Sequence, residues 1–460
     1  MHTFINEKIK REYLIQLLIY MILLNLIFYS YFKIFKKESE FSPFSSEITK
    51  ITIKDGKMAN FGIISDFQLD QENSNIAYQY YSDNVYKALE FYKKNDIDIL
   101  LIAGDITNNG HIRNYLHFKK IFYSIYNNSK IPTIISVMGN NDCRDKQFTK
   151  IENQKKFFNY IKVYPYSHYI INNYNFIFWS NDNSKSDERG IEDYTWIKSA
   201  LEKARNNINK KGDPIFVVTH MPPKGTVYGS ELFHKGIYDF LKNYPEVICI
   251  SGHSHHSLKN IRSIWQGEFT AINTQSLSYT SIDNYFENKG EVSINSAKNY
   301  SMGLIANLNE ESIIFDRIEF CTGEKYGESW KITFPLEPEK FIYQFDKRNK
   351  KIKPVFQDKN EIKIEKITKN DKINYYIHFK AAFHEDYVYS YKIVLRIKDK
   401  KDIYKELYYY SDYYKNKLDR KEILQFLLPN DVKKGIYNIE IYGVDSFENI
   451  SNPIIGIIEI

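Results

Sequence analysis

The chain has 460 residues, of which 43% are hydrophobic and 26% charged, and its formal net charge is only +6. This composition excludes a disordered chain, and so small a charge on so long a chain argues against a nucleic-acid-binding protein. Three cysteines, far apart in the sequence, exclude a disulfide scaffold and a cysteine-rich zinc module. The length predicts two or three domains that can bury a core.

An uncharged run lies near the amino terminus. After a short tail over residues 1–12, residues 13–32 read YLIQLLIYMILLNLIFYSYF, which is the length a helix needs to cross a bilayer. No cleavage site for a signal peptide follows the run, so we expect an uncleaved transmembrane anchor and then a linker over 33–57. The two flanks of the run carry equal numbers of basic residues, so their charge does not decide the orientation in the membrane. Our expectation is a short tail inside and an extracytoplasmic catalytic domain; a buried core helix is the alternative.

Short apolar runs alternate with helical patterns over residues 58–336. The runs are rich in Ile, Val or Phe, which is typical of buried strands. They are Phe61–Ser65, Ile97–Ala103, Thr133–Met138, Asn175–Ser180, Ile215–Thr219, Val247–Ser251 and Thr270–Asn273. Helical patterns cover Tyr81–Lys94, Tyr194–Arg205 and Leu232–Tyr244. This alternation predicts an α/β domain.

The character of the chain changes from about residue 337. Lys-rich, strand-like segments follow one another with turn signals between them and without long helical patterns. The segments are Glu361–Ile367, Asn374–Phe379, Tyr389–Ile397, Glu422–Leu428 and Tyr437–Val444. They predict an all-β sandwich, roughly of immunoglobulin type, over residues 337–460.

Polar clusters follow five of the predicted strands of the α/β domain. They are Ser65–Gln68, Gly104–Asn108, Gly139–Asp142, Thr219–Pro223 and Gly252–His255. One such cluster alone is usually a turn, but ligands of α/β folds collect beyond the carboxyl ends of strands. Carboxylate, amide and imidazole groups together suit two divalent ions, Mn, Fe or Zn, which can hold a phosphate and activate a water. Asp105 is the candidate that bridges the two ions and offsets their repulsion.

The order of these clusters resembles the calcineurin-like metallophosphoesterase superfamily, whose pattern is D-x-H, G-D, G-N-H-D, H and G-H-x-H. The resemblance covers about residues 61–314. It implies a four-layer αββα sandwich of two mixed sheets flanked by helices. It also implies one metal held by Asp66, Gln68, Asp105 and His255, and another held by Asp105, Asn140, His220 and His253. Residues 438–451 resemble the β-sandwich end of some membrane or secreted members.

Two positions depart from the family pattern. Gln68 stands where the family has a metal-binding His; its neutral oxygen favours Mn or Fe over Zn and weakens binding. Asn141 stands where the family has a His that protonates the leaving oxygen or steadies the phosphate. An Asn donates a hydrogen bond but transfers no proton near pH 7, so Arg144 or His111 would have to stand in.

Without an evident general acid, the sequence predicts a metal-dependent phosphoesterase that prefers phosphodiesters or activated leaving groups. A metal-bound hydroxide would attack phosphorus in line, with Asp105, Asn140 and Asn141 as the catalytic residues. The expected partners are a phosphate-ester substrate and the membrane, and the sequence indicates no oligomeric state. One alternative is a catalytically impaired surface module whose β-sandwich binds a partner or the cell wall. Another is hydrolysis of a monoester or pyrophosphate on a lipid or cell-wall precursor.

Overall fold

The computed structural model divides the chain into two units, residues 1–43 and 44–460. It describes residues 19–26, 41–53, 58–73, 75–180, 191–208, 210–231, 233, 235–281, 300–349, 351–357, 360–369 and 372–460. In the first unit, residues 19–26 are helical and their apolar side chains are exposed. The other residues of the predicted anchor, 13–18 and 27–32, lie outside the described residues. Within the described ranges, no helix has the length and apolar character that crossing a membrane requires.

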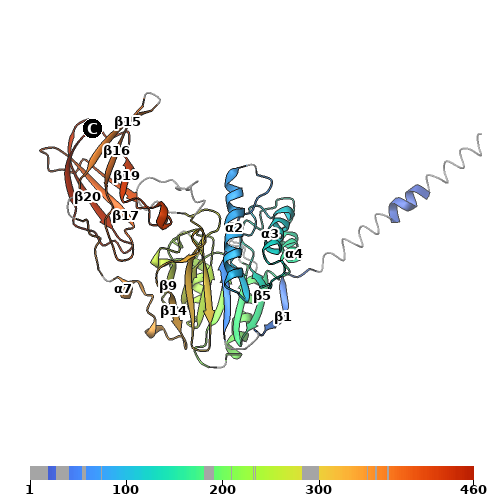
Figure 1. Cartoon of the computed structure of the whole chain (residues 1–460). Coiled ribbons are helices and arrows are strands. Elements are labelled where there is room, and N and C mark those ends of the chain that lie inside the picture. Colours follow the sequence, from blue (N-terminus) through green and yellow to red (C-terminus); the bar gives the residue numbers. More distant parts are fainter. Residues whose placement is uncertain are drawn as a thin grey trace, which may run out of the picture. The chain divides into compact units, whose positions relative to one another are not determined.

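Two mixed β-sheets form the core of the second unit's amino-terminal part (Figure 1). The first sheet has the order β1-β5-β6-β7-β8-β10-β9, and the second has the order β13-β12-β11-β2-β3-β4, with β14 paired to β12. The strands of the first are β1 Phe44–Ile51, β5 Tyr166–Ile171, β6 Tyr174–Trp179, β7 Ile215–Thr219, β8 Val247–Ser251, β9 Ile264–Gln266 and β10 Thr270–Asn273. Those of the second are β2 Ala59–Ile64, β3 Ile99–Ile102, β4 Thr133–Ser136, β11 Met302–Leu308, β12 Ser312–Glu319, β13 Glu324–Lys325 and β14 Trp330–Thr333.

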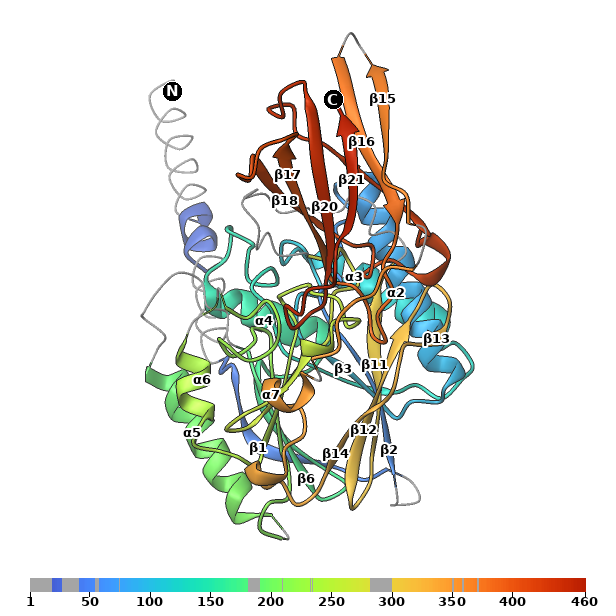
Figure 2. The same ribbon diagram turned by 90° about the vertical axis from the view of Figure 1, so that its left-hand side faces the viewer.

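Helices cover the outer faces of both sheets (Figure 2). Helices α2 (Ile76–Lys94), α3 (Ile112–Ile125) and α4 (Lys150–Ile161) share a core with the second sheet. Helices α5 (Ile191–Asn206) and α6 (Lys235–Leu241) share a separate core with the first. The prediction of an α/β domain is confirmed.

Strand β7 shows how the sequence produces these layers. Its five residues are all apolar or small and buried, as expected for a strand covered on both faces. Because successive side chains point to opposite faces, Phe216 and Val218 pack between the sheets while Ile215 and Val217 pack under α5 and α6. Between the sheets, Phe176 stacks on Phe216 with ring centroids 4.3 Å apart.

The boundaries of this domain differ from the prediction. Strand β1 lies within residues 33–57, which we expected to be a linker, and it pairs in parallel with β5. At the other end, Leu336 and Phe341 belong to the buried core of the two sheets, so the domain continues past residue 336. Helix α6 is also shorter than the predicted Leu232–Tyr244, and Leu232 lies outside the described residues.

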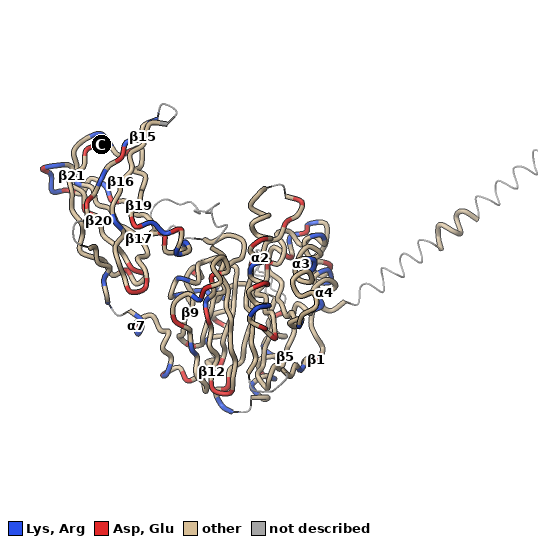
Figure 3. The backbone as a smooth tube through the Cα atoms, viewed as in Figure 1, with Lys and Arg blue, Asp and Glu red and all other residues tan. Residues whose placement is uncertain are grey.

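The carboxy-terminal part is all β, as predicted. One sheet has the order β15-β16-β19 and the other β18-β17-β20-β21, with every pairing antiparallel. Side chains of both sheets share one hydrophobic core. The strands are β15 Lys363–Lys369, β16 Lys372–Lys380, β17 Ser390–Ile397, β18 Lys405–Tyr410, β19 Ile423–Leu427, β20 Ile436–Val444 and β21 Ile454–Glu459. Basic and acidic residues are interspersed along these strands and along the helices (Figure 3).

The two parts of the second unit touch through a tyrosine cluster and a buried lysine. Tyr228 of the first part packs with tyrosines of the second, and its hydroxyl is hydrogen-bonded to that of Tyr389. Lys259, which is 1% exposed, forms an ion pair with Glu319 and donates to the carbonyl of Lys415 at 2.5 Å. Burial lowers the pKa of Lys259 to about 8.

Candidate metal centre

The loops that follow parallel strands of both sheets meet at one place. Strands β2, β3 and β4 are parallel neighbours in the second sheet, and β7 and β8 are parallel neighbours in the first. Backbone groups join the loops across the sheets: the His253 N–H donates to Asp66 Oδ2 at 2.9 Å, and His220 Nδ1 lies 2.8 Å from the Ala103 carbonyl oxygen. The five predicted polar clusters are therefore brought together, as expected for the carboxyl edge of such sheets.

Three potential ligand atoms lie close to the side chain of His220. Its Nε2 lies 3.1 Å from Asn140 Oδ1, 3.1 Å from His253 Nδ1 and 3.3 Å from Asp105 Oδ2. Ligand atoms held about 2.1 Å from one ion at tetrahedral or octahedral angles lie about 3.0–3.4 Å from one another. The three distances from His220 Nε2 fall within or near this range, and the four residues are those predicted for the second metal site.

Two residues of the first predicted site, Asp66 and Gln68, lie close to a third, His255. Its Nε2 lies 3.1 Å from Asp66 Oδ1 and 3.3 Å from the side-chain nitrogen of Gln68. A half-turn of the Gln68 amide would aim its oxygen at the same point. Asp66 Oδ1 is buried and accepts no hydrogen bond from any described residue, which is costly for a carboxylate unless a cation lies beside it. Ligand atoms of Asp66, Asp105, His220 and His253 all lie within 4.8 Å of one another.

Hydrogen bonds orient the two imidazoles for binding a metal. Nδ1 of His220 faces the carbonyl of Ala103 at 2.8 Å, and Nδ1 of His255 faces the carbonyl of Tyr279 at 3.2 Å. A carbonyl only accepts, so both Nδ1 atoms carry the proton and both Nε2 atoms of the neutral rings keep a lone pair. Metal-binding histidines are usually fixed in this way.

The pKa values of the buried groups also indicate that the centre favours a bound positive charge. Burial opposes a charged His220, but the carboxylates of Asp105 and Asp66 outweigh it and raise the pKa of His220 to about 9. Burial and the neighbouring His220 lower the pKa of His253 to about 3. Burial would raise the pKa of Asp66, yet His255 and His220 hold it well below its usual range. Divalent ions would take the place of the proton on His220, because only neutral imidazole ligates.

Backbone strain is concentrated at the same residues. The φ angles are +54° for Asp66, +47° for Gln68, +54° for Asp105, +64° for His253 and +56° for His255. Residues other than glycine adopt this left-handed region uncommonly and at a cost of about 1–3 kcal/mol each. Such strain persists where the surrounding structure enforces it, and it clusters at functional sites.

The predicted catalytic asparagines take different positions. Asn140 is half-buried and aims its oxygen at His220. Asn141 is 3% exposed, and its backbone N–H and its side-chain Nδ2 donate to the two carboxylate oxygens of Asp105 at 2.8 and 2.7 Å. Both hydrogen bonds of Asn141 therefore go to Asp105. His111, a suggested substitute, lies 3.2 Å from a carboxylate oxygen of Glu72.

Replacing Asn141 with Ala is expected to lower kcat by about 10–100-fold, because partners of metal ligands typically contribute this much. A positioning role predicts the same fold loss for esters with p-nitrophenyl and with alkyl leaving groups. Steady-state kinetics on both substrates would check this. A loss confined to the alkyl ester would instead make Asn141 a donor to the leaving oxygen.

No role was assigned from the sequence to Asp142, a residue that holds the loops of the site together. Asp142 accepts from Gly139 N–H at 3.0 Å and from Thr107 N–H and Oγ1 at 2.9 Å, so it ties the loops after β3 and β4 together. Burial and the nearby Asp105 raise its pKa to about 6. Its position in the Gly139–Asp142 cluster was the feature of the sequence that could have pointed to this role.

No sequence pattern pointed to two aromatic rings that lie beside the centre. The ring of Phe233 lies 5.0 Å from that of His253, and the ring of Tyr279 lies 4.2 Å from that of His255. Both belong to loops without a recognisable pattern.

Residues 59–257 match the model of the calcineurin-like phosphoesterase family. The chain therefore contains a calcineurin-like metallophosphoesterase domain and is a phosphoesterase hydrolase. No match was found among curated proteins.

Solved structures similar to 60% of the chain include two phosphatases. A dimetal phosphatase from Danio rerio is covered over 99% of its length at 12% identity and a TM-score of 0.39. A purple acid phosphatase from yellow lupin is covered over 54% of its length at 13% identity and a TM-score of 0.42. With TM-scores this low, the assignment of the domain rests on the family match.

Proposed function

We propose that this phosphoesterase hydrolyses phosphodiesters with the help of two divalent metal ions held at the centre described above. The observation that carries the proposal is the convergence of Asn140, Asp105 and His253 on Nε2 of His220, at 3.1–3.3 Å. Two such ions, when bound, lower the pKa of a water and stabilise the charge that develops on the phosphoryl oxygens.

Each residue of the centre would have a specific role in binding the two ions. Asp66, Gln68 and His255 would hold one ion and Asn140, His220 and His253 the other. Asp105 would bridge them, because its carboxylate lies within 4.8 Å of ligand atoms of Asp66, His220 and His253. Asn141 would hold that carboxylate in place through its two hydrogen bonds. Mn or Fe suits this oxygen-rich donor set better than Zn.

The preference for diesters rests on the missing proton donor. Asn141 occupies the family's histidine position and is committed to Asp105, so no imidazole of that loop serves the leaving oxygen. General acid catalysis is worth about 10²–10⁴-fold, and its loss penalises poor leaving groups most. Esters with stable leaving groups are therefore the favoured substrates.

Removal and return of metal test the function directly. The full-length chain, stripped with a chelator, should not turn over bis-p-nitrophenyl phosphate, and added Mn²⁺ should restore turnover. Metal analysis should find two ions per chain. Turnover absent with Mn, Fe, Co and Zn, together with less than one ion per chain, would instead favour the non-catalytic surface module.

Replacing Gln68 with His tests the first metal site. Imidazole is a stronger donor than a neutral amide oxygen, so the variant should bind metal about tenfold more tightly and shift its preference toward Zn. Competition with a chromophoric chelator would give the dissociation constants for Mn²⁺ and Zn²⁺. Unchanged constants for both would show that residue 68 is not a ligand. Gln71→His, in the same loop, is the matched control because Gln71 pairs with His117.

The location of the chain is part of the proposal. The uncharged run over residues 13–32 supports a membrane anchor, with the catalytic domain on the extracytoplasmic side. The pairing of a three-stranded with a four-stranded antiparallel sheet supports an immunoglobulin-type sandwich at the carboxy terminus.

A further inference from the structure

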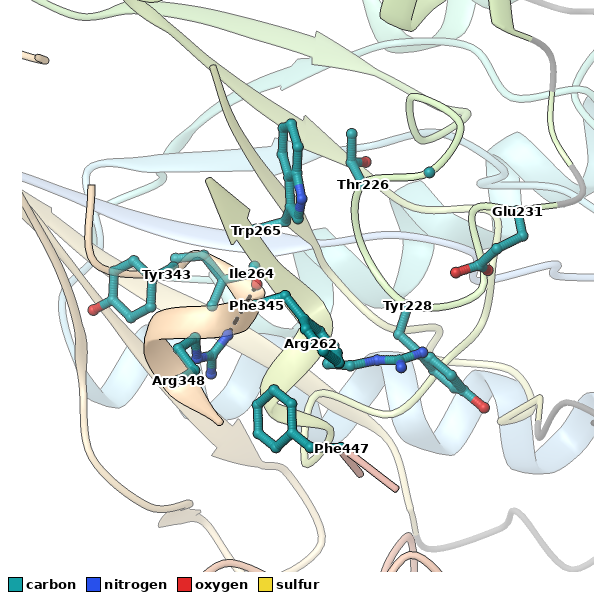
Figure 4. Close-up of a pocket in the computed structure, with 11 residues that line it drawn as sticks. Thr226, Tyr228, Glu231, Arg262, Ile264, Trp265, Tyr343, Phe345, Arg348 and Phe447 are labelled. Carbon is teal, nitrogen blue, oxygen red and sulfur yellow. Dashed lines mark hydrogen bonds between the residues drawn. The ribbon is translucent and has the colours of Figure 1, made fainter. Parts of the chain in front are cut away.

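A cavity outside the metal centre lies where the phosphoesterase domain meets the carboxy-terminal sandwich. Its volume is about 210 Å³ (Figure 4). The loop after β7 contributes Tyr228, the segment leading into β9 contributes Arg262, and the short helix α7 (Phe345–Arg348) contributes Arg348. Phe447, from the turn after β20, closes the cavity from the side of the sandwich. None of its lining residues is a candidate metal ligand.

Two guanidinium groups of this cavity have no acidic partner within the part of the chain that the structure describes. Among the residues that the structure describes, no carboxylate oxygen lies within 4.0 Å of Arg262 or Arg348. Arg348 donates one hydrogen bond, to the carbonyl of Ile264 at 3.0 Å, and Arg262 lies over the ring of Tyr228 at 4.3 Å. A guanidinium carries five donors, so most of them remain available to a ligand.

The charge of the cavity is positive at neutral pH. Burial lowers the pKa of Arg348 to about 10, which still leaves the group protonated. Asp386 acts on Arg348 only from beyond ion-pair distance. Glu231, an exposed residue, is the one carboxylate among the lining residues, so the two arginines leave a net positive charge. Guanidinium groups match the planar geometry of phosphate and carboxylate oxygens and bind them through paired hydrogen bonds.

Aromatic side chains form much of the remaining wall. Trp265, Tyr343 and Phe447 line the cavity together with the two arginines (Figure 4). Ligand sites commonly combine such apolar walls with a few polar groups that fix orientation. Sites for drug-sized ligands measure about 300–1,000 Å³, so a cavity of about 210 Å³ suits one ring and one anionic group.

We propose that this cavity binds a small organic phosphate that carries one planar ring, with Arg262 and Arg348 holding the phosphate and the aromatic walls holding the ring. The site lies beside the catalytic loops. The Tyr228 ring contacts that of His256 at 4.9 Å, and His256 directly follows the candidate ligand His255. The binding needs no metal, so it stands apart from the proposed hydrolysis.

Calorimetric titration of the full-length chain in excess chelator tests the site, because the metal centre then offers no competing phosphate ligand. The probes are phenyl phosphate, which carries one ring and one phosphate, and adenosine 5′-monophosphate, which tests whether a larger fused ring joined through a ribose is also accepted. We expect one of them to bind at one site per chain. Inorganic phosphate and adenosine should each bind at least about tenfold more weakly, because each lacks one half of the ligand.

Variants locate the binding. Arg262→Gln should weaken it at least about tenfold, and Arg262→Lys should recover part of the loss because it keeps the charge but not the paired donors. Arg348→Gln should act like Arg262→Gln, while Arg113→Gln, on the surface of α3 and 74% exposed, should change nothing. The proposal is overturned if neither probe binds, if Arg262→Gln and Arg348→Gln bind as tightly as the unmodified chain, or if Arg113→Gln weakens binding equally.

Discussion

Replacing Asp105 with Asn is expected to lower metal-dependent turnover by about 10³-fold or more, or about 4 kcal/mol at 1.36 kcal/mol per tenfold. Asp105 is the carboxylate that we propose to bridge the two ions; its Oδ2 lies 3.3 Å from His220 Nε2, and both of its oxygens accept hydrogen bonds from Asn141. The amide keeps the shape of the side chain but loses the charge that offsets two neighbouring cations. Both ions should therefore bind more weakly.

Two measurements check this result. Turnover of bis-p-nitrophenyl phosphate at saturating Mn²⁺ reports on catalysis, and metal content after gel filtration reports on binding. Asp239→Asn, on the exposed surface of α6 where Asp239 pairs with Lys242, is the matched control and should leave both unchanged. Turnover retained within tenfold by Asp105→Asn would contradict a bridging carboxylate.

Replacing Gly139 with Ala is the second substitution with a large expected effect. A Cβ at Gly139 would lie 2.5 Å from the backbone nitrogen of Asp105 and would collide with its carboxylate. The loops after β3 and β4 would have to separate, and overpacking of this kind costs about 1–3 kcal/mol. Because misplacing a reacting group by about 1 Å can cost 10²-fold, turnover should fall by about 10²-fold.

Thermal unfolding and turnover, measured on the same samples, separate the two effects. Gly435→Ala is the matched control, since its Cβ would meet only the Tyr437 ring at ordinary contact distances of 3.6–3.8 Å. That variant should keep full turnover. If Gly139→Ala also kept it, the close approach of the two loops would not matter for catalysis.

Much of the sheet architecture was predictable because its strands are buried on both faces. Ile215–Thr219 and Val247–Ser251 are continuous apolar runs, and both became strands with the predicted bounds. Strand β1 was not predicted because it lies at the edge of its sheet, and its Ser, Glu, Thr and Lys residues leave neither an apolar run nor a regular alternation. Helix α3 was not predicted from the sequence. Its buried face includes Asn114 and Tyr115, and these residues interrupt the helical spacing of apolar residues.

The composition of the candidate site was predictable, but the direction of each side chain was not. Strand order places polar clusters at one edge, so the sequence predicts that Asp66, Asp105 and His220 lie together. Whether Asn141 faces the open side or Asp105 depends on the turn that begins at Gly139. That turn is held by Asp142, whose bonds reach back to Thr107, 35 residues earlier. Such long-range bonds leave no periodic trace in the sequence.

The contact between the phosphoesterase domain and the sandwich has a practical consequence for dissecting the protein. Lys259 is enclosed by Glu319 and by the carbonyl of Lys415, and Tyr228 is enclosed by tyrosines of the sandwich. A fragment that ends near residue 336 would uncover both and would also lose Phe341 from the core. The loop that carries Tyr228 begins at His220, a candidate metal ligand. A fragment that spans residues 44–460 retains all of these contacts, whereas one that ends near residue 336 does not.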